Sequence, residues 1–478
     1  MTTIVLEVPD ELNGFELALK ELVAVAVAQL RRAGGRGPAR YAAFETDIAA
    51  ALGGVERSVH AAALTALDID TPRLAINGVD HVRVMREATT FFTLAGGASV
   101  VRTLYRPAGA RNAPVVDVVA LRVGAIEKVW LPATARAMAF LLQQGTSREA
   151  EASAEQIGRL PYSHTSFQNV GQAVGRRFVG MQETIEEALI AEYEIPAEAQ
   201  NVSVSLDRVA VPMEEPRKRP VGRPREGAAK RPIQVAYRMA YCGTVTLHDG
   251  KGEALHTIRY GTMAGCDARS LCEGMADDVL HLLAQRPSMD LSLLCDGAPE
   301  MWNLLDAQFN EASFGRRPTH RLVDFWHLIE KLSFAARVIF DTDETRKQAT
   351  TRWRSLLLNR SDAAPTIHGE LTASGKEHVA IGDKEPVHEV MTYITNHGKA
   401  ERLNYAASRR LGLPIGSGNV EATCKTLVSV RMKRSGARWK IETGNHIIAL
   451  RALAQSDRWD HAMDLTLDPA KLSLRRAA

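Results

Sequence analysis

The sequence predicts an α/β fold whose second half contains a mixed β-sheet, and three observations support this prediction. Residues 201–212 alternate between apolar and polar side chains, which is the period of a strand. Strand-like runs over 233–247 and 254–260 follow, so three successive strands are expected to form an antiparallel meander. A helical run over 268–285 then leads to the apolar run 290–295, which has the length of a buried strand.

Residues 1–145 are expected to form an α+β region to which the sequence assigns no role. Apolar side chains at helical spacing predict helices over 11–32 and 42–67. A hairpin is expected over 89–105, because β-branched and aromatic residues flank a glycine turn there. Residues 114–123 supply a further strand-like run.

Residues 146–200 are expected to hold two helices, 148–160 and 164–193, separated by a break at 161–163. A helix-turn-helix has this arrangement, and its second helix enters the major groove of DNA. An ordinary antiparallel helix pair with a solvated face fits the pattern equally well. In the first interpretation, the second helix carries three side chains suited to bases or phosphates: Gln172, Arg176 and Arg177.

The predicted core is divided along the chain. Its first part covers residues 201–327, and its second part covers 411–460. The polar, helix-forming residues 328–410 between them are expected to be an inserted helical domain. Residues 461–478 are expected to be a peripheral tail.

Three acidic residues stand at separate places in this core. Asp207 lies within a strand, Asp296 ends a strand before a glycine turn, and Glu421 lies on a late helix. This order of elements is that of a ribonuclease-H-like core: meander strands, a helix, a strand ending in Asp, and then a helix bearing Glu. Two Mg²⁺ ions, or Mn²⁺ in their place, require oxygen ligands from such separate elements. The simpler alternative for Glu421 is that it only complements the helix dipole.

The helix that carries Glu421 is expected to begin after Pro414, with Ser417 or Asn419 capping its first turn. Apolar residues recur on it at helical spacing and should face a core: Val420, Cys424, Leu427 and Val428. A basic stretch with one aromatic residue, Trp439, follows. Its cations suggest contact with a polyanion: Lys425, Arg431, Lys433, Arg434 and Arg438.

Composition sets outer limits on the function. The formal net charge is only +3, so any nucleic-acid surface must come from local basic stretches. The five cysteines are scattered without a Cys-x-x-Cys pair, which argues against a zinc site and a disulfide framework and fits a reducing cytosol. Neither a signal peptide nor an apolar run long enough to span a membrane is visible. A cytoplasmic, nucleoid-associated protein is therefore expected.

Four stretches of the second half resemble the bacterial insertion-sequence transposases of the ISKra type, which are DDE enzymes related to the Mutator and hAT-like groups. These stretches are 204–212, 295–298, 323–327 and 414–422, with the Lys433–Trp439 run extending the match. The Asp-Gly-Ala and Gly-Ser-Gly-x-x-Glu motifs together make the resemblance specific. It covers residues before Asp207 only loosely.

The resemblance implies cleavage of DNA at the ends of a mobile element and transfer of the strands into target DNA. Asp207, Asp296 and Glu421 would be the catalytic, metal-binding acids. Asp324 and His327 match an Asp/Cys-x-x-His signature and would be accessory residues, although a buried His at a helix start is an equal alternative. The partners would be element ends and target DNA, and the enzyme would assemble as a homo-oligomer on them.

Other assignments remain open at the level of sequence. Asp249 also follows a strand, although Asp-Gly is ordinary turn chemistry. A non-catalytic, transposase-derived DNA-binding protein and a structure-specific nuclease are alternative functions.

The loop 216–225 has a Gly-Arg-Pro-Arg centre that resembles an AT-hook, with Val221 where an Arg is usual. A solvated loop is equally compatible with this sequence. Its DNA-binding candidates are Arg217, Lys218, Arg219, Arg223 and Arg225.

Overall fold

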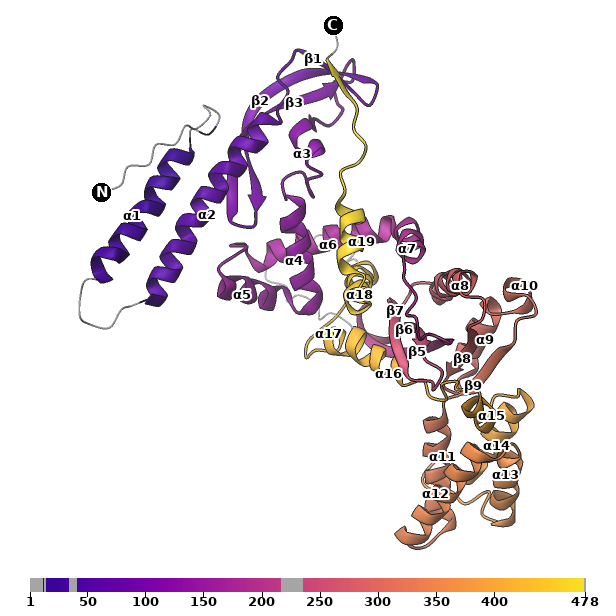
Figure 1. The fold of residues 1–478 in the computed structure, drawn as a ribbon. Helices are drawn as coiled ribbons and strands as arrows, with labels where there is room; N and C mark the ends of the chain where they lie inside the picture. Colours follow the sequence, from indigo (N-terminus) through magenta and orange to yellow (C-terminus); the bar gives the residue numbers. More distant parts are fainter. Residues whose placement is uncertain (1–11, 13, 34–40, 216–234, 477–478) are drawn as a thin grey trace, which may run out of the picture. The chain divides into compact units, whose positions relative to one another are not determined.

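A computed structural model describes residues 12, 14–33, 41–215 and 235–476 (Figure 1). The chain divides into two compact units, one of residues 1–181 with 460–478 and the other of residues 182–459. The inserted helices belong to the second unit, and the C-terminal residues belong to the first. The described part of the chain contains no helix long and apolar enough to cross a membrane.

The first unit is built from helices and an antiparallel sheet. Its helices are α1 (Phe15–Ala33), α2 (Tyr41–Ala66), α3 (Val118–Arg122), α4 (Pro132–Gln144), α5 (Ser147–Ile157), α6 (His164–Gly180) and most of α19 (Trp459–Leu467). Its strands are β1 (Arg73–Ile76), β2 (Val79–Thr93), β3 (Gly96–Pro107), β4 (Val116–Asp117) and β10 (Leu474–Arg476), in the sheet order β10-β1-β2-β3-β4. The expected hairpin is confirmed as β2 and β3, which pack with α2 through Leu64, Phe91 and Val100.

Two expectations for this unit are wrong. The run 114–123 is not a strand, because only Val116 and Asp117 pair with β3 and the Asp117 carboxylate then caps α3 by accepting from Ala120 N at 3.0 Å. The C-terminal residues are not peripheral, because Leu474–Arg476 pairs along β1 as an edge strand.

The predicted helix pair is present, but its second helix is shorter than expected. Thr146 and Glu149 form a capping box at the start of α5, and Gly158 ends it with φ of 66°. The second helix ends at Gly180, and the remainder is a separate helix, α7 (Gln182–Ala191), in the second unit. Both α5 and α6 pack against α4, so a third helix covers part of the expected DNA-binding surface.

The second unit is organised around a mixed sheet. Its strands are β5 (Asn201–Glu214), β6 (Val235–His248), β7 (Ala254–Thr262), β8 (Asp290–Cys295) and β9 (Thr319–Val323), in the order β7-β6-β5-β8-β9. Strands β5, β6 and β7 are antiparallel, whereas β8 and β9 run parallel to β5. The meander and the following buried strand are thus confirmed. This sheet is compatible with the expected ribonuclease-H-like core.

Helices cover both faces of this sheet. They include α8 (Ala268–Gln285), α9 (Pro299–Gln308), α10 (Glu311–Phe314), α16 (Gly418–Thr423), the π-helix η2 (Cys424–Ser429), α17 (Val430–Met432) and α18 (Ile441–Gln455). A Cβ on Gly243 would lie 2.2 Å from the Met275 sulfur of α8, and one on Gly261 would lie 2.7 Å from Leu427 of η2. Because Gly243 pairs with Tyr260, next to Gly261, the two glycines face opposite sides and allow close helix packing on each.

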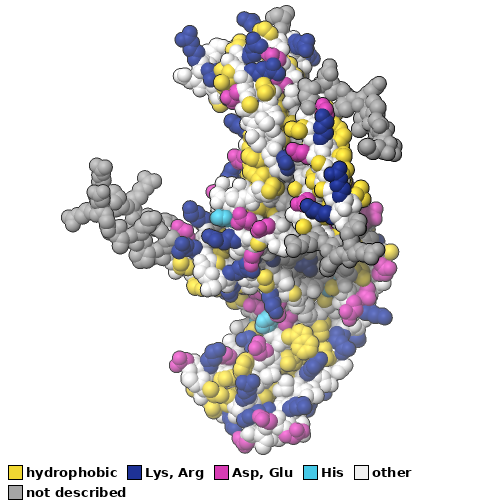
Figure 2. Space-filling view, turned by 90° about the vertical axis from the view of Figure 1, so that its left-hand side faces the viewer, with side chains coloured by type: hydrophobic (Ala, Val, Ile, Leu, Met, Phe, Trp, Pro, Cys, Tyr) yellow, Lys and Arg dark blue, Asp and Glu magenta, His cyan; other side chains and the backbone are white. Residues whose placement is uncertain are grey.

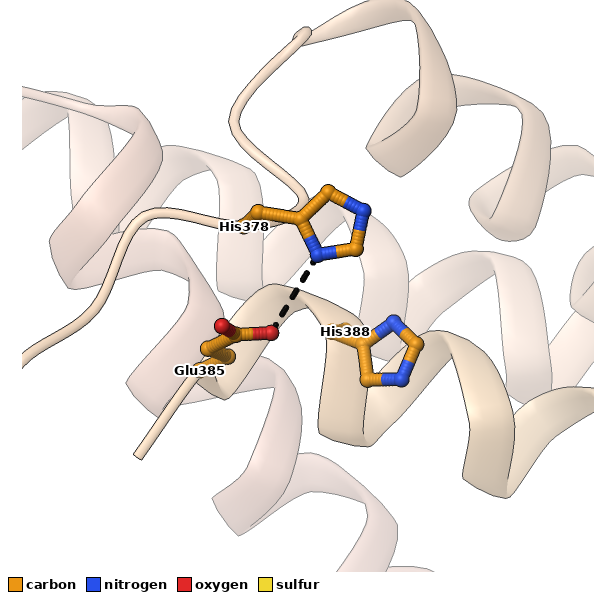
Figure 3. A group of neighbouring side chains, drawn as sticks. All are labelled: His378, Glu385 and His388. Atoms are coloured by element: carbon orange, nitrogen blue, oxygen red, sulfur yellow. Dashed lines mark hydrogen bonds and ion pairs between the residues drawn. The ribbon is translucent and has the colours of Figure 1, made fainter. Parts of the chain in front are cut away.

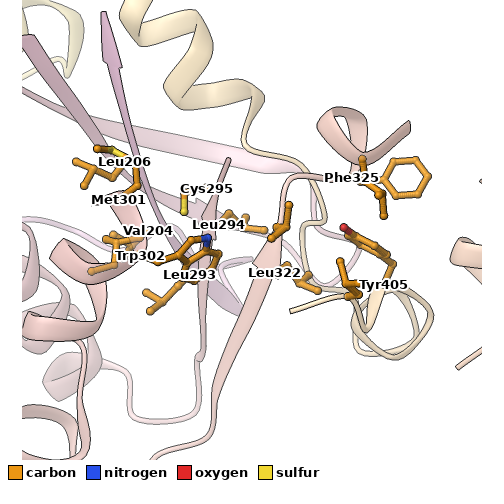
Figure 4. Packing of buried hydrophobic residues seen from close by; sticks show 14 of the residues in the cluster. Val204, Leu206, Leu293, Leu294, Cys295, Met301, Trp302, Leu322, Phe325 and Tyr405 are labelled. Carbon is orange, nitrogen blue, oxygen red and sulfur yellow. The ribbon is translucent and has the colours of Figure 1, made fainter. Parts of the chain in front are cut away.

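The carboxyl ends of the parallel strands rest on a continuous apolar core (Figure 4). Leu206, Cys295 and Leu322 of three neighbouring strands are buried there with Trp302 of α9 and Phe325. Five inserted helices follow: α11 (Phe325–Ile339), α12 (Asp343–Asn359), α13 (Ala363–Ala373), α14 (Pro386–Lys399) and α15 (Tyr405–Arg410). The helical character expected for 328–410 is confirmed, and this core fixes the sheet edge where the candidate acids lie.

Candidate active site

Asp207 and Asp296 lie side by side on two neighbouring parallel strands, Asp207 in the middle of β5 and Asp296 directly after the last residue of β8. Leu206 of β5 pairs with Cys295 of β8, and each Asp is the next residue in its chain. Neighbouring strands are about 4.8 Å apart, so the two backbones meet at this spacing. The Asp296 carboxylate accepts a hydrogen bond from Ala298 N at 3.0 Å, which fixes the turn into α9.

Glu421 reaches the same place from α16. His327 of α11 lies between it and Asp324, with its Nδ1 atom 3.6 Å from Glu421 Oε1 and 3.4 Å from Asp324 Oδ1. The ligand atoms of Asp324, His327 and Glu421 all lie within 4.8 Å of one another. The structure therefore brings all three predicted acids and both accessory residues to one region of the second unit.

Electrostatic coupling supports this arrangement. Burial raises the pKa of Asp207, and the neighbouring charge of Asp296 raises it further, against hydrogen bonds from Arg208 N and Cys424 and the charge of His327. Burial also raises the pKa of Glu421, opposed by His327 and assisted by Asp324 and Asp207. Several carboxylates thus face one another, with the His327 imidazole among them.

The contact with Asp324 raises the pKa of His327 to about 9, against the opposing effect of burial. Glu421 and Asp296 raise this pKa further. The imidazole is therefore protonated at neutral pH and partly neutralises the surrounding carboxylates. Its side chain remains 36% exposed, so it is accessible from solvent.

Asp324 is a buried connection between two segments that are far apart in the sequence. Its side chain is 1% exposed and caps α11 by accepting from His327 N at 2.9 Å. Its other oxygen accepts from the backbone N and, at 2.9 Å, the hydroxyl of Ser417. These bonds and the His327 contact hold the pKa of Asp324 below its ordinary value despite burial. Asp324 thereby fixes the loop that immediately precedes Glu421.

The expected capping of the Glu421 helix is wrong in detail. Ser417 occupies the N-cap position, but its side chain makes no capping bond because it is bound to Asp324. Asn419 instead donates to Thr246 Oγ1 at 3.3 Å. The four apolar residues expected to face the core are buried, although the helix continues as η2, a π-helical segment of a kind frequent at functional sites.

Gly297 allows the inserted helices to contact the Asp296 turn. A Cβ at this position would lie 2.2 Å from the Tyr393 ring of α14. The close approach of the Tyr393 ring therefore explains why the Asp-Gly-Ala motif has a glycine at this position. Sequence analysis missed Tyr393, and it also missed the Cys424 thiol that bonds Asp207. No local pattern marks either residue, because each acts through a contact made only in the folded chain.

The alternative first acid lies elsewhere. Asp249 follows His248, which pairs with Asn201 at the start of β5, six residues before Asp207. Its Oδ1 atom accepts from Lys251 N at 2.8 Å and Glu253 N at 2.9 Å, and these bonds lower its pKa. Asp249 is therefore a turn residue, and the length of β8 separates it from Asp296.

A divalent metal ion fits the carboxylate group. Asp207, Asp296 and Glu421 supply the hard oxygen ligands that Mg²⁺ and Mn²⁺ prefer. The pKa values of Asp207 and Glu421 are raised partly by the repulsion between neighbouring carboxylates, which a bound cation would relieve. The donor set is thus suitable for the expected cofactor.

The candidate DNA-binding residues fall into three groups. Lys425, Lys433, Arg434 and Arg438 are exposed around the Glu421 helix. The prediction that Arg431 contacts DNA is wrong, because this residue is only 5% exposed. Its guanidinium lies 4.9 Å from the ring centroid of Trp439. Trp439 is itself held on β5, where its backbone N donates to Pro212 O at 3.0 Å. The five basic residues of the loop 216–225 lie outside the described residues.

In the first unit, the prediction that Gln172 contacts DNA is also wrong. Its side chain is buried at 7% exposure within α6, so it is not presented to a groove of DNA. Arg176 remains 62% exposed, with its Nη1 3.7 Å from Glu127 Oε1. Arg177 donates to the backbone O of Asp468 at 2.9 Å. On the face shown in Figure 2, basic and acidic side chains are interspersed.

Comparisons with known proteins give little further identification. No family model matches the chain. No curated protein matches it in sequence. Among solved structures, it is similar to the Drosophila P element transposase strand transfer complex, with a TM-score of 0.34 and 9% identity, over 68% of this chain and 92% of that chain. This similarity is too weak to carry an argument about function.

Proposed function

We propose that this protein is a DDE transposase that cleaves DNA at the ends of an insertion sequence and joins the strands to target DNA. One observation carries the proposal. Asp207 in the middle of β5 lies beside Asp296 at the end of the parallel strand β8, and His327 connects them electrostatically to Glu421 on a helix more than a hundred residues further along the chain. The motifs that hold these acids resemble those of bacterial ISKra-type transposases.

In this proposal, Asp207, Asp296 and Glu421 hold two Mg²⁺ ions. The ions, when bound, would supply an activated water or 3′-hydroxyl and stabilise the leaving oxygen. The protein itself contributes position: Asp324 fixes the segment before Glu421, and His327 orients the Glu421 carboxylate. His327 also supplies positive charge next to the site where a phosphate would bind.

DNA would approach over the exposed cations next to this site. Lys425, Lys433, Arg434 and Arg438 are the residues proposed to contact the phosphate backbone, together with the basic loop 216–225. Recognition of the element ends is assigned to residues 146–200, with Arg176 as its exposed cation. Assembly as a homo-oligomer on DNA, in the bacterial cytoplasm, belongs to the same proposal.

The proposal is tested by Mg²⁺-dependent cleavage of a fragment that carries the terminal repeats flanking the gene. Asp207→Asn, Asp296→Asn and Glu421→Gln should each lower the cleavage rate by about 10³-fold or more, because each removes a negatively charged ligand of the proposed Mg²⁺ ions. All three should retain DNA binding, which depends on Lys and Arg. Asp249→Asn is the matched control and should cleave at the unaltered rate.

The products distinguish the alternatives. Strand joining to a target plasmid is expected of a transposase, whereas cleavage of branched DNA without joining would identify a nuclease. End-specific binding with no cleavage by the unaltered protein would identify a non-catalytic DNA-binding protein. Loss of cleavage in Asp249→Asn together with full activity in Asp207→Asn would overturn the site assignment.

A further inference from the structure

A second group of histidine and carboxylate side chains lies in the inserted helical region, between α13 and α14. It consists of His378 in the connecting segment, Glu385 at the N-cap of α14, and His388 in the first turn of α14 (Figure 3). His378 Nδ1 lies 3.3 Å from Glu385 Oε2, and the two imidazole centroids are 5.4 Å apart. Ligand atoms of all three residues lie within 4.8 Å of one another.

The segment that presents these side chains is held in place by its own hydrogen bonds. Ile381 and Lys384 pair as an antiparallel bridge, with Ile381 N donating to Lys384 O at 2.8 Å. Gly382 occupies the turn with φ of 61°, a conformation that favours glycine. The bridge therefore returns the chain so that His378 faces Glu385 and His388.

The other end of the segment is anchored to α11. The Lys376 ammonium donates to the backbone O atoms of Val338 and Ile339 at 3.2 Å each, at the C-terminal end of that helix. A tight hairpin and a lysine anchor thus position the group before any ligand binds. Preorganisation of this kind lowers the entropic cost of binding.

Burial does not explain why two imidazoles meet here. His378 is 72% exposed and His388 is 46% exposed, so neither contributes much to a core. A fourth donor is adjacent, because His388 Nδ1 lies 3.1 Å from Glu377 Oε1. His388 therefore has a carboxylate outside the donor set on one nitrogen, an arrangement that orients histidine ligands in metal sites.

We propose that His378, Glu385 and His388 bind a first-row divalent cation, with Zn²⁺ as the preferred ion. Two imidazoles and a carboxylate are donors that Zn²⁺ accepts at about 2.0–2.2 Å, whereas Mg²⁺ prefers oxygen ligands alone. Glu377 would orient His388 or provide the fourth ligand. Zinc donors stand roughly 3.4 Å apart in a tetrahedral site. The His378 Nδ1 and Glu385 Oε2 atoms are already 3.3 Å apart, and all three ligand atoms lie within 4.8 Å of one another.

The bound ion would fasten the segment between α13 and α14 to the first turn of α14. Through Lys376 this segment also contacts α11, whose N-terminal turn carries Asp324 and His327. The scattered cysteines argued against zinc, but none of them contributes to this donor set. The site is a structural one that is chemically distinct from the carboxylate group of the proposed active site.

The test uses the full-length protein, stripped of metal and then titrated with Zn²⁺ in excess Mg²⁺, with binding followed by calorimetry and thermal unfolding. In the double variant His378→Ala/His388→Ala, the affinity of this site for Zn²⁺ should fall at least about 100-fold, so that one binding event disappears from the titration. The Tm of this variant should not rise when Zn²⁺ is added. The matched control, His281→Ala/His320→Ala, removes two histidines of the same unit and should bind as the unaltered protein does.

A further variant separates this site from the proposed active site. Glu421→Gln should leave the Zn²⁺ binding event intact, whatever its effect on DNA cleavage. Co²⁺ should give the intense visible absorption of a tetrahedral complex in Glu421→Gln but not in the histidine double variant. Equal Zn²⁺ affinity of the double variant and the unaltered protein would overturn the inference, as would loss of the binding event in Glu421→Gln alone.

Discussion

Two groups of histidine and carboxylate side chains occur in the second unit and differ both in composition and in the burial of one member. The inner cluster consists of Asp324, His327 and Glu421, and the outer cluster consists of His378, Glu385 and His388. In both, the ligand atoms lie within 4.8 Å of one another. Yet Asp324 is 1% exposed, whereas His378 is 72% exposed.

This difference determines what each cluster can do. In the inner cluster, the buried Asp324 carboxylate couples strongly to His327, so the pKa of His327 rises to about 9 and the residues position one another. In the outer cluster, solvent screens the ion pairs, which therefore contribute little to stability. Related side chains thus form a network fixed by one buried carboxylate in one place and an accessible donor set in the other.

The largest effect is expected from breaking the inner cluster at its buried residue. Asp324→Asn should lower the free energy of unfolding by about 2–4 kcal/mol, because the capping bond and both Ser417 bonds lose their charged acceptor. Denaturant unfolding measures this change. Asp383→Asn, in the exposed hairpin of the outer cluster, is the matched control and should change stability by less than about 0.5 kcal/mol. Equal effects would show that burial does not separate the clusters.

A smaller effect is expected where the inserted helices meet the inner region. Gly297→Ala places a methyl group 2.2 Å from the Tyr393 ring, so we expect a loss of about 1–3 kcal/mol from overpacking. Gly369→Ala in exposed α13 has no neighbour within 4 Å and should stabilise the protein by about 0.5–1 kcal/mol. Thermal unfolding of the two variants compares them. Destabilisation by both substitutions would contradict the close-approach argument.

The next prediction concerns pH. The folded pKa of His327 is about 9 against an ordinary value of 6.5, so its stabilising contribution is complete below pH 6.5 and is lost as the pH rises through 9. The side chain is 36% exposed, so solvent screening reduces the expected loss to about 1–2 kcal/mol. Unfolding with EDTA at pH 6 and pH 9.5 measures it. His327→Gln should flatten this difference, and an unchanged pH profile in that variant would exclude His327 as its source.

The smallest effect is expected in the outer cluster without metal. His378→Ala should change the free energy of unfolding in EDTA by less than about 0.5 kcal/mol, because its ion pair with Glu385 is solvent-exposed. Added Zn²⁺ should then separate the variant from the unaltered protein. A loss of 2 kcal/mol or more in EDTA would show instead that the histidine stabilises the fold by itself.

Much of the second unit could be predicted from local pattern. The alternation over 201–212 and the apolar run 290–295 correspond to β5 (Asn201–Glu214) and β8 (Asp290–Cys295), because strand periodicity and apolar runs are properties of neighbouring residues. The same holds for α8, whose bounds agree with the expected helix. Local pattern failed at 114–123, where the Asp117 side chain competed for the backbone and began a helix.

The sequence identified the candidate site residues but not whether they lie close together. Residue types and motif spacing were sufficient to nominate Asp207, Asp296 and Glu421, because a carboxylate within an alternating strand, one at a strand end and one after a Gly-Ser-Gly turn are local features. Whether the three meet depends on strand register, which joins Leu206 to Cys295 across the sheet. Register is set by side-chain packing between segments that are distant in the chain, and no local pattern encodes it.

Burial was likewise decided only by the tertiary structure. The sequence presented Gln172 and Arg431 as candidate DNA contacts, since amide and guanidinium groups usually face solvent. Packing of α4 against α6, and of Trp439 on β5, places both side chains inside. The outer cluster was invisible in the sequence for the same reason: the bridge between Ile381 and Lys384 brings its ligands together. Sequence determines which groups are available, and the folded contacts determine which of them meet and which remain in water.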